Sequence, residues 1–474
     1  MQKCYSPLRA KWSIFLVIAL SPLLLYAVIQ ILPTHDDWAS TTTPDFSPFF
    51  IKEHFLFYGY HWRPFDTWIG YIVGRNPQLL YPSFNHILVV IGHLLCTLTI
   101  YHLLSILNFS TAAKNITTLF FFITPATMAT VLAVDSQNQT YALFIDLLAF
   151  LFYIKNNKWK YVGWTLLIFI ATLTKENGLM WALICPIMAY AFSFINSKTL
   201  KKDLIIGIAI MIAYALAIIL LPKDITIHPE YEPNVMKIVK NIIKFFFTSF
   251  ITVDYIYLLH QPSRSLLLSG ITLLFTLPFF YYIYIKPWKS LLNRKIKFII
   301  ICLLIAVAPH LGTIFSMMHT YAGLAIIAII TAYSIDSYQH ILKPIVISFV
   351  LWITATISIN IHLIDSSIKS GVIGKKMAID AIQKTGSPVD NVYVIIIQDD
   401  YPKLSSFCVI PNEAFGWGLA ARYETNYQWP ETIQDTIIQR SEDYANIVEA
   451  IFNNSSVDCV WIVNHDQIRV INNE

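Results

Sequence analysis

The sequence predicts a polytopic α-helical membrane protein that ends in a small α/β domain, and two observations lead to this prediction. Hydrophobic residues make up 56% of the 474 positions and charged residues only 13%, whereas charged residues are about a quarter of ordinary soluble domains. Apolar runs near the roughly 20 residues that cross a bilayer divide the first three quarters of the chain. This composition excludes a soluble globular enzyme.

The first apolar run follows Lys3, Arg9 and Lys11 and precedes no small-residue cleavage pattern. We therefore expect a retained first helix rather than a removed signal peptide. Ten more apolar runs follow, which gives about 11 transmembrane helices. The expected spans lie at roughly 12–32, 84–107, 116–133, 139–154, 160–174, 177–196, 204–222, 265–285, 298–316, 320–337 and 342–364.

Basic residues in the short loops predict the orientation, because lysine and arginine concentrate on the cytoplasmic side. With a cytoplasmic N-terminus, the loops that carry Lys155, Lys201, Arg294 and Lys343 all lie inside. We expect a multi-pass protein of a bacterial inner membrane with an extracytoplasmic C-terminal domain. Transmembrane domain 1–364 then has extracytoplasmic loops 33–83 and 223–264, and domain 365–474 follows.

Two segments need a separate interpretation. The run Ile242–Tyr257 is apolar, but counting it as a span would place the basic loop 286–297 outside, so we expect an interfacial or re-entrant helix there. In the tail, periodicity predicts helices at Lys375–Lys384 and Ser441–Phe452 and buried strands at Val392–Ile397 and Val457–Val463. A disulfide between Cys408 and Cys459 and two free thiols are both compatible with the sequence.

The charge balance gives little indication of a soluble partner. The chain has 33 basic and 29 acidic side chains and a formal net charge of +4. We therefore expect no nucleic-acid partner, and we expect membrane lipids to be the surroundings of most of the chain.

Two adjacent carboxylates, Asp36 and Asp37, follow His35 directly after the first expected span. Paired acids at the edge of a membrane can bind a cation, or one can act as a base whose proton affinity its neighbour raises. A solvated helix end explains the same residues without any function.

The remainder of the first loop interleaves aromatic residues with Arg63 and Asp66. An aromatic belt at the membrane surface explains the tryptophans and tyrosines. The planar guanidinium of Arg63 also suits the oxygens of a phosphate. Both interpretations stay open at this point.

Lys175 and Glu176 form a charged pair between two apolar runs that almost no loop separates. Charges near a membrane normally face protein or a water-filled cavity, so the pair either neutralises itself or offers a cation to a lipid phosphate. Asp135 and Gln137, in the turn between the third and fourth spans, face the same side and could add polar contacts.

These residues resemble the type C (GT-C) membrane glycosyltransferases, in particular the protein O-mannosyltransferase branch. The resemblance lies in Asp36–Asp37, Trp62–Arg63–Pro64, the Asp135 turn, Lys175–Glu176 and, less clearly, Val253–Asp254–Tyr255. It covers about the first 260 residues. Where relatives often carry an arginine before a late span, this chain has His319, and its tail has no tetratricopeptide pattern.

The resemblance implies an enzyme that moves a sugar from a polyprenyl-phosphate donor to a hydroxyl on a protein, glycan or lipid outside the cytoplasm. In this scheme Asp36 is the general base of an inverting transfer, and Asp37 orients the acceptor or binds a divalent metal ion. Arg63 and Lys175 hold the donor phosphate, with Glu176 positioning Lys175. His35, Asp66, Asp135 and Gln137 would contact the acceptor or sugar, and a metal site would use Asp36, Asp37 and Glu176. The alternatives are a transporter or flippase, or a ligase, of lipid-linked saccharides.

Overall fold

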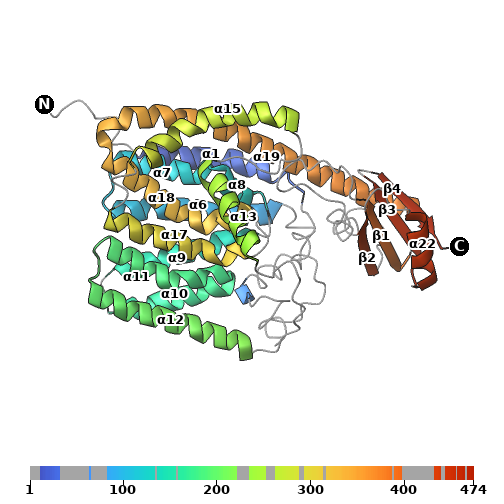
Figure 1. Cartoon of the computed structure of the whole chain (residues 1–474), viewed down its shortest axis with the longest axis horizontal. Coiled ribbons are helices and arrows are strands. Elements are labelled where there is room, and N and C mark those ends of the chain that lie inside the picture. Colours follow the sequence, from blue (N-terminus) through green and yellow to red (C-terminus); the bar gives the residue numbers. More distant parts are fainter. Residues whose placement is uncertain are drawn as a thin grey trace.

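The computed structural model is a long bundle of helices that carries a small β-sheet beyond one of its ends (Figure 1). The structure describes residues 11–32, 63–65, 83–133, 136–155, 158–220, 234–251, 262–287, 293–312, 317–386, 389–397, 432–438, 444–454, 456–464 and 467–473. Successive helices run back and forth along the bundle axis, as expected for apolar segments joined by short turns.

The helices of the first half are α1 (Trp12–Val28), α6 (Ser83–Ile106), α7 (Thr111–Ile123), α8 (Pro125–Val131), α9 (Gln137–Ile154), α10 (Lys160–Thr174), the short 3₁₀ helix η3 (Glu176–Met180), α11 (Trp181–Ala191) and α12 (Ser197–Leu220). Those of the second half are α13 (Val235–Phe246), the π-turn η5 (Phe247–Ile251), α15 (Pro262–Phe280), the π-turn η6 (Tyr281–Ile285), α17 (Arg294–Leu311), the 3₁₀ helices η7 (Met317–Thr320) and η8 (Gln339–Ile341), α18 (Tyr321–Ser337) and α19 (Leu342–Thr385).

In the described part of the chain, four helices are long and apolar enough to cross a membrane: His86–Ile106, Ser197–Ile219, Met317–Ser337 and Leu342–Thr385. Three further apolar helical segments, Trp12–Val28, Lys160–Thr174 and Gly270–Ile285, are shorter. The protein is therefore a helical membrane protein. The expected number of about 11 long spans is wrong for the described residues.

The difference arises because hydropathy counts apolar residues, whereas a span of full length also needs an unbroken helix. The apolar run 116–133 is interrupted at Thr124, whose extended backbone separates α7 from α8. The run 177–196 begins with the 3₁₀ helix η3, so that α11 has only 11 residues. Neighbouring helices cover these broken segments, which removes the need for each one to span the bilayer alone.

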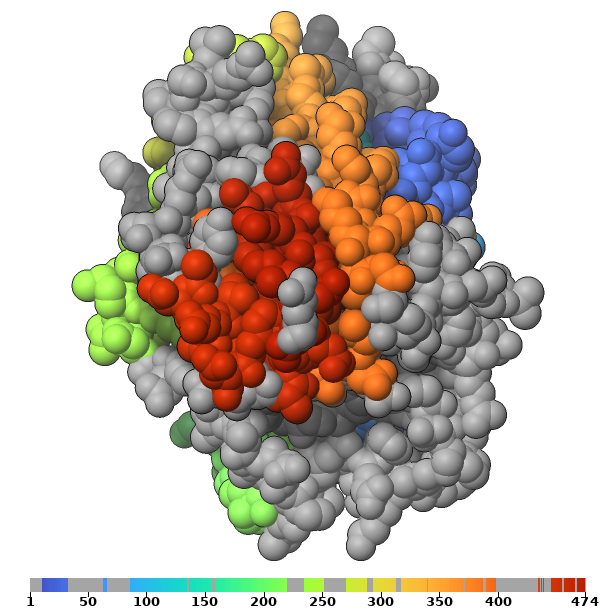
Figure 2. Space-filling model, turned by 90° about the vertical axis from the view of Figure 1, so that its right-hand side faces the viewer, coloured from blue at the N-terminus to red at the C-terminus, as the bar shows by residue number. Residues whose placement is uncertain are grey.

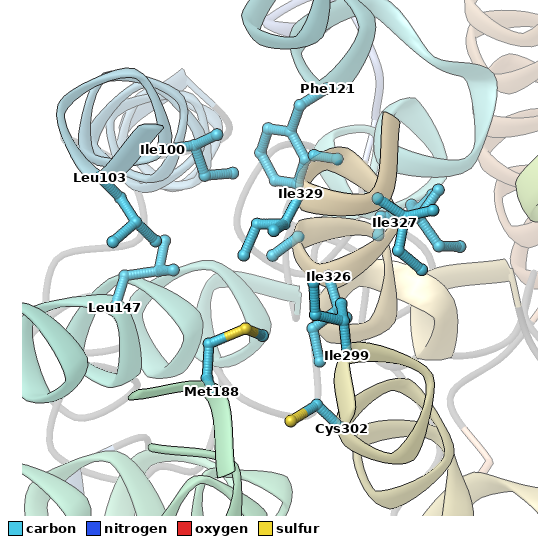
Figure 3. Packing of buried hydrophobic residues seen from close by; sticks show 14 of the residues in the cluster. Ile100, Leu103, Phe121, Leu147, Met188, Ile299, Cys302, Ile326, Ile327 and Ile329 are labelled. Atoms are coloured by element: carbon cyan, nitrogen blue, oxygen red, sulfur yellow. The ribbon is translucent and has the colours of Figure 1, made fainter. Parts of the chain in front are cut away.

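The core of the bundle lies around α18. In the most apolar part of the span Met317–Ser337, which contains α18, 83% of the residues are buried. The corresponding share for α12 is 22%, and this helix lies at the periphery of the bundle (Figure 1). Side chains of α6, α7, α9, α11 and α17 interlock with those of α18 (Figure 3). The residues labelled there are Ile100, Leu103, Phe121, Leu147, Met188, Ile299, Cys302, Ile326, Ile327 and Ile329.

The helix α19 continues from the bundle into the C-terminal domain without a break. It has 44 residues and is capped after Thr385 by Gly386, whose φ of 74° is the left-handed conformation typical of a helix end. The expected span 342–364 and the expected helix Lys375–Lys384 are therefore parts of one helix, and the expected domain boundary at residue 364 falls inside it.

The C-terminal sheet has four strands in the order β2-β1-β3-β4. The strands are β1 (Asn391–Ile397), β2 (Thr432–Ile438), β3 (Cys459–Asn464) and β4 (Gln467–Asn472). β1 pairs in parallel with β2 and β3, and β4 is antiparallel to β3. The predicted strands around β1 and β3 are present, and the helix expected at Ser441–Phe452 is α22 (Tyr444–Asn454).

Both faces of this sheet are covered by helix, which explains the apolar β1 and β3. Val392, Val394 and Ile396 pack with Met377 and Ala381 of α19. Ile395 and Ile397 pack with Val448 of α22 on the opposite face, as the alternation of side chains along a strand requires. Figure 2, seen from this end of the molecule, shows α19 in orange running to the strands in red.

The two ends of the bundle differ in the segments that they carry. At the end that faces the sheet, the chain just after α1 contacts α19, because a Cβ at Gly371 would lie 2.9 Å from the Cβ of Leu32. We call this end the site end. At the opposite end, tight turns follow α6, α9, α11 and α18 (Figure 1). The basic residues in or beside these turns are Lys114, Lys155, Lys158, Lys160, Lys198, Lys201, Lys202 and Lys343, and Lys286, Arg294, Lys295 and Lys297 flank the connection from η6 to α17. We call it the lysine-rich end.

Candidate functional site

An ion pair joins two distant parts of the sequence at the site end. The Nε of Arg63 lies 2.7 Å from Oε1 of Glu176, and the two side chains are 17% and 31% exposed. Arg63 precedes a single helical turn in the first long loop, and Glu176 begins η3. The structure thus brings together two of the residues that the sequence singled out, and it pairs Glu176 with Arg63.

The backbone at Lys175 explains how this turn presents charge. α10 ends at Thr174, and Lys175 is extended, with φ −154° and ψ 132°, before η3 begins at Glu176. Gly178 allows η3 to fold back onto α10, since a Cβ there would lie 2.7 Å from the carbonyl carbon of Ala171 and 2.9 Å from the nitrogen of Thr172. The tight reversal places Lys175 and Glu176 side by side at the rim of the bundle.

Polar side chains at the start of α9 adjoin this turn. The Nδ2 of Asn177 donates to Oε1 of Gln139 over 3.3 Å, which links η3 to α9. Gln137 is 4% exposed, and within the described residues its Oε1 accepts no hydrogen bond. A buried amide oxygen without a donor is costly, so this corner is suited to a polar ligand group or water.

Two histidines lie close to the same charges. The rings of His310, at the end of α17, and His319, in η7, stack with centroids 4.5 Å apart and an interplanar angle of 9°. The charges of Lys175, Glu176 and Arg63 all act on His310, and those of Glu176 and Arg63 act on Tyr214 of α12. The sequence gives no signal for this pair, because no pattern links residues on either side of a helix break.

Several of the predicted site residues lie outside the described residues. These are His35, Asp36, Asp37, Asp66 and Asp135. The predicted general base and the predicted acceptor contacts among them stay predictions, and so does the metal site, two of whose three candidates are Asp36 and Asp37. Within the described residues no group of three or more His, Cys, Asp and Glu side chains could hold a metal ion.

The arrangement is suited to binding an anion. Arg63 and Lys175 carry two positive charges against the single carboxylate of Glu176, so these three groups leave one positive charge. Arg63 is mostly buried and its carboxylate partner fixes its orientation, which lowers the entropy lost when the guanidinium binds an anion. Partial burial also strengthens the attraction to an anion relative to bulk water.

Comparisons with known proteins add no name to this site. No protein-family model matches the chain, and no curated protein is significantly similar to it. The geometry of the site therefore carries the functional argument.

Proposed function

We propose that the protein is an integral-membrane glycosyltransferase of the GT-C type, similar to protein O-mannosyltransferases, that uses a polyprenyl-phosphate sugar as donor. The observation that carries the proposal is the 2.7 Å contact between Arg63 and Glu176, next to Lys175, at one end of a membrane-embedded helix bundle. A lipid-linked donor presents its phosphate at the membrane surface, where a cationic site on helix ends can reach it.

In the proposed reaction the bond between the anomeric carbon and the donor phosphate breaks, and the acceptor hydroxyl oxygen bonds to that carbon from the opposite side. Asp36 accepts the hydroxyl proton, and Arg63 and Lys175 stabilise the negative charge on the leaving phosphate. Glu176 positions Arg63. Asp37 orients the acceptor or binds a divalent ion, and His310, His319, Gln137 and Tyr214 line the same region.

The proposal includes an orientation. The site end and the C-terminal domain lie outside the cytoplasm, the lysine-rich end faces the cytoplasm, and the membrane is a bacterial inner membrane. The four long apolar helices cross it, and the shorter apolar helices pack among them. The run α13–η5 is not one of the crossings, since it packs against α8, α17 and η7 at the site end.

A donor-consumption assay tests the proposed activity. Purified protein in lipid nanodiscs is incubated with radiolabelled prenyl-phosphate mannose or glucose and a hydroxyl acceptor, and consumption of the donor is followed. We expect Asp36→Asn to slow transfer by about 10²–10⁴-fold because the general base is lost. Arg63→Ala and Lys175→Ala should weaken donor binding, whereas Lys369→Gln, at an exposed ion pair on α19, serves as the unaffected control.

The proposal fails if folded protein consumes none of the donors, or if Asp36→Asn transfers sugar at the rate of the wild type. Folding of each variant is checked by gel filtration and thermal unfolding before activity is compared.

One observation favours a second candidate, a transporter or flippase of lipid-linked saccharides. Asp146, in the middle of α9, is 1% exposed, and within the described residues its Oδ1 has no hydrogen-bond partner. Buried acids in membrane helices often belong to ion or proton pathways. By contrast, His86 hydrogen-bonds to the carbonyl oxygen of Ile31 and His93 to the Tyr321 hydroxyl, and these long-range bonds tie helices together. Movement of labelled donor across liposomes, lost in Asp146→Asn, would favour transport over transfer.

A further inference from the structure

The cations of the lysine-rich end differ from those of the site end in what they contact. Many lie over aromatic rings: Lys114 over Tyr101, Lys158 over Trp159, Lys202 over Tyr161, Lys286 over Tyr282, Arg294 over Tyr190 and Phe298, and Lys295 over Phe192 and Tyr333. The acids described at this end are Asp203 and Asp336, so most of these charges have no acidic counterpart there. A cation over a ring face keeps its outward N–H groups available for an anion.

The start of α17 concentrates this feature. Arg294 lies with its guanidinium carbon 5.2 Å from the ring centroid of Tyr190 and donates to the Tyr190 hydroxyl. The adjacent Lys295 places its Nζ 4.6 Å from the ring centroid of Phe192. Lys297, on the next turn, is exposed. The first four residues of α17 thus carry three positive charges, two of which lie over aromatic rings.

The exposed face of α17 changes from cationic to apolar along its length. Arg294, Lys297, Ile301 and Leu304 follow at intervals of three or four residues, so they lie on one side of the helix. Ile301 is 41% exposed and Leu304 61%. The distance from Lys297 to Ala308, which is also exposed, is about 16 Å at a rise of about 1.5 Å per residue. One leaflet of the hydrocarbon core has a thickness of about 15 Å.

We propose that this face of α17 binds an anionic phospholipid, whose phosphate contacts Arg294 and Lys297 and whose acyl chains lie along Ile301 and Leu304. The charge of the head group complements the cations, and the length of the apolar stripe matches the chains of one leaflet. Lys295, held over Phe192, adds positive potential beside the phosphate. The site lies at the opposite end of the bundle from the proposed sugar-transfer site and does not depend on that activity.

The test is native mass spectrometry of the full-length protein in detergent, titrated with phosphatidylglycerol or phosphatidylcholine. We expect tighter binding of phosphatidylglycerol. The variant Arg294→Gln/Lys297→Gln removes two charges and keeps helix-forming side chains. Each cation near a membrane surface raises the affinity for an anionic lipid roughly fivefold. The double variant should therefore bind phosphatidylglycerol about 25-fold more weakly than the wild type. The control Lys369→Gln/Lys376→Gln removes two exposed charges from α19 and should bind as the wild type does.

Two further measurements keep the proposal testable if the double variant fails to fold. If the double variant does not fold, the wild type alone decides, because raised salt must weaken phosphatidylglycerol binding and leave phosphatidylcholine binding unchanged. Inorganic phosphate at millimolar concentration should not displace the lipid. Equal affinities for the two lipids, wild-type affinity in the double variant, or displacement by free phosphate would each overturn the assignment of an anionic lipid.

Discussion

The two ends of the bundle use charged side chains in different ways. At the site end, Arg63 contacts the carboxylate of Glu176, and both side chains are partly exposed. At the lysine-rich end, cations lie over aromatic rings, and the buried pair is Lys160 with Asp203, where the Asp203 side chain has 0% exposure. A charge can therefore hold helices together or stay available for a ligand, and burial distinguishes the two roles.

Irregular backbone occurs at both ends, since the π-turn η6 and the 3₁₀ helix η8 adjoin the lysine-rich end, but the two ends differ in what these elements present. At the site end, α8, η3 and η7 are short elements that break the helical runs and bring polar groups toward one another. At the lysine-rich end, short turns join long helices, and side chains such as Asn293, which donates to the Tyr333 hydroxyl over 2.6 Å, tie neighbouring turns together. Irregular backbone in a membrane protein occurs where it lines a polar region, which agrees with the placement of the site.

The largest expected effects, on stability and on activity, come from replacing the carboxylates of Asp203 and Glu176 by amides. Asp203 accepts hydrogen bonds from Tyr153, from Tyr161 over 3.0 Å and from Lys160 over 3.5 Å. Asp203→Asn leaves Lys160 buried without a counter-charge and should cost about 3 kcal/mol of unfolding free energy. Glu176→Gln should cost about 1 kcal/mol or less, yet it should abolish most of the proposed sugar transfer.

Denaturant titration of both variants in detergent, together with the donor-consumption assay, checks this contrast. The result that would contradict the distinction is a Glu176→Gln variant that unfolds as easily as Asp203→Asn, or an Asp203→Asn variant that is stable but inactive.

A smaller effect is expected from two glycines. Gly178→Ala forces a Cβ to within 2.7 Å of the backbone of Ala171 and must displace the turn that carries Lys175 and Glu176. We expect a loss of about 1–3 kcal/mol and weaker donor binding. Gly270→Ala in α15 is the matched control, because nothing lies within 4 Å of its added Cβ and alanine favours helix by about 1 kcal/mol. Thermal unfolding and donor titration of the pair measure both effects; equal behaviour of the two variants would argue against a constrained turn.

The smallest effect concerns the C-terminal domain, which packs on α19 far from the lysine-rich end. Cys459 in β3 is a buried free thiol, and burial raises its pKa to about 11. The thiol is therefore protonated at neutral pH, and iodoacetamide should label it slowly there and faster as the pH rises toward 11. We expect the same neutral-pH rate in Asp203→Asn, measured by peptide mass spectrometry. Faster labelling in that variant would show that the bundle and the domain unfold together.

Much of this organisation could be predicted from the sequence. Low charge and apolar runs identify a helical membrane protein. Continuous apolar stretches identified β1 and β3, because strands buried on both faces lack alternation. Arg63, Lys175 and Glu176 were expected on one face from the parity of the helices between them, and the structure brings Arg63 and Glu176 into contact.

Other features could not be predicted. The strands β2 and β4 lie at the edges of the sheet, and only their pairing with β1 and β3 defines them. The number of long spans was overestimated because no hydropathy pattern marks the break at Thr124 or the 3₁₀ turn at Glu176. The contact between Arg63 and Glu176 joins residues 113 positions apart, and it follows the extended backbone at Lys175, which no local pattern marks.

The sequence by itself determined that this chain is a helical membrane protein, that many of its charges lie at helix ends and that buried strands follow, because these properties depend on composition and local periodicity. Only the tertiary structure decided which charges meet, that His310 stacks on His319, and that α17 presents cations above an apolar stripe. Contacts between residues far apart in the chain depend on how helices end, turn and pack, and no local pattern carries that information.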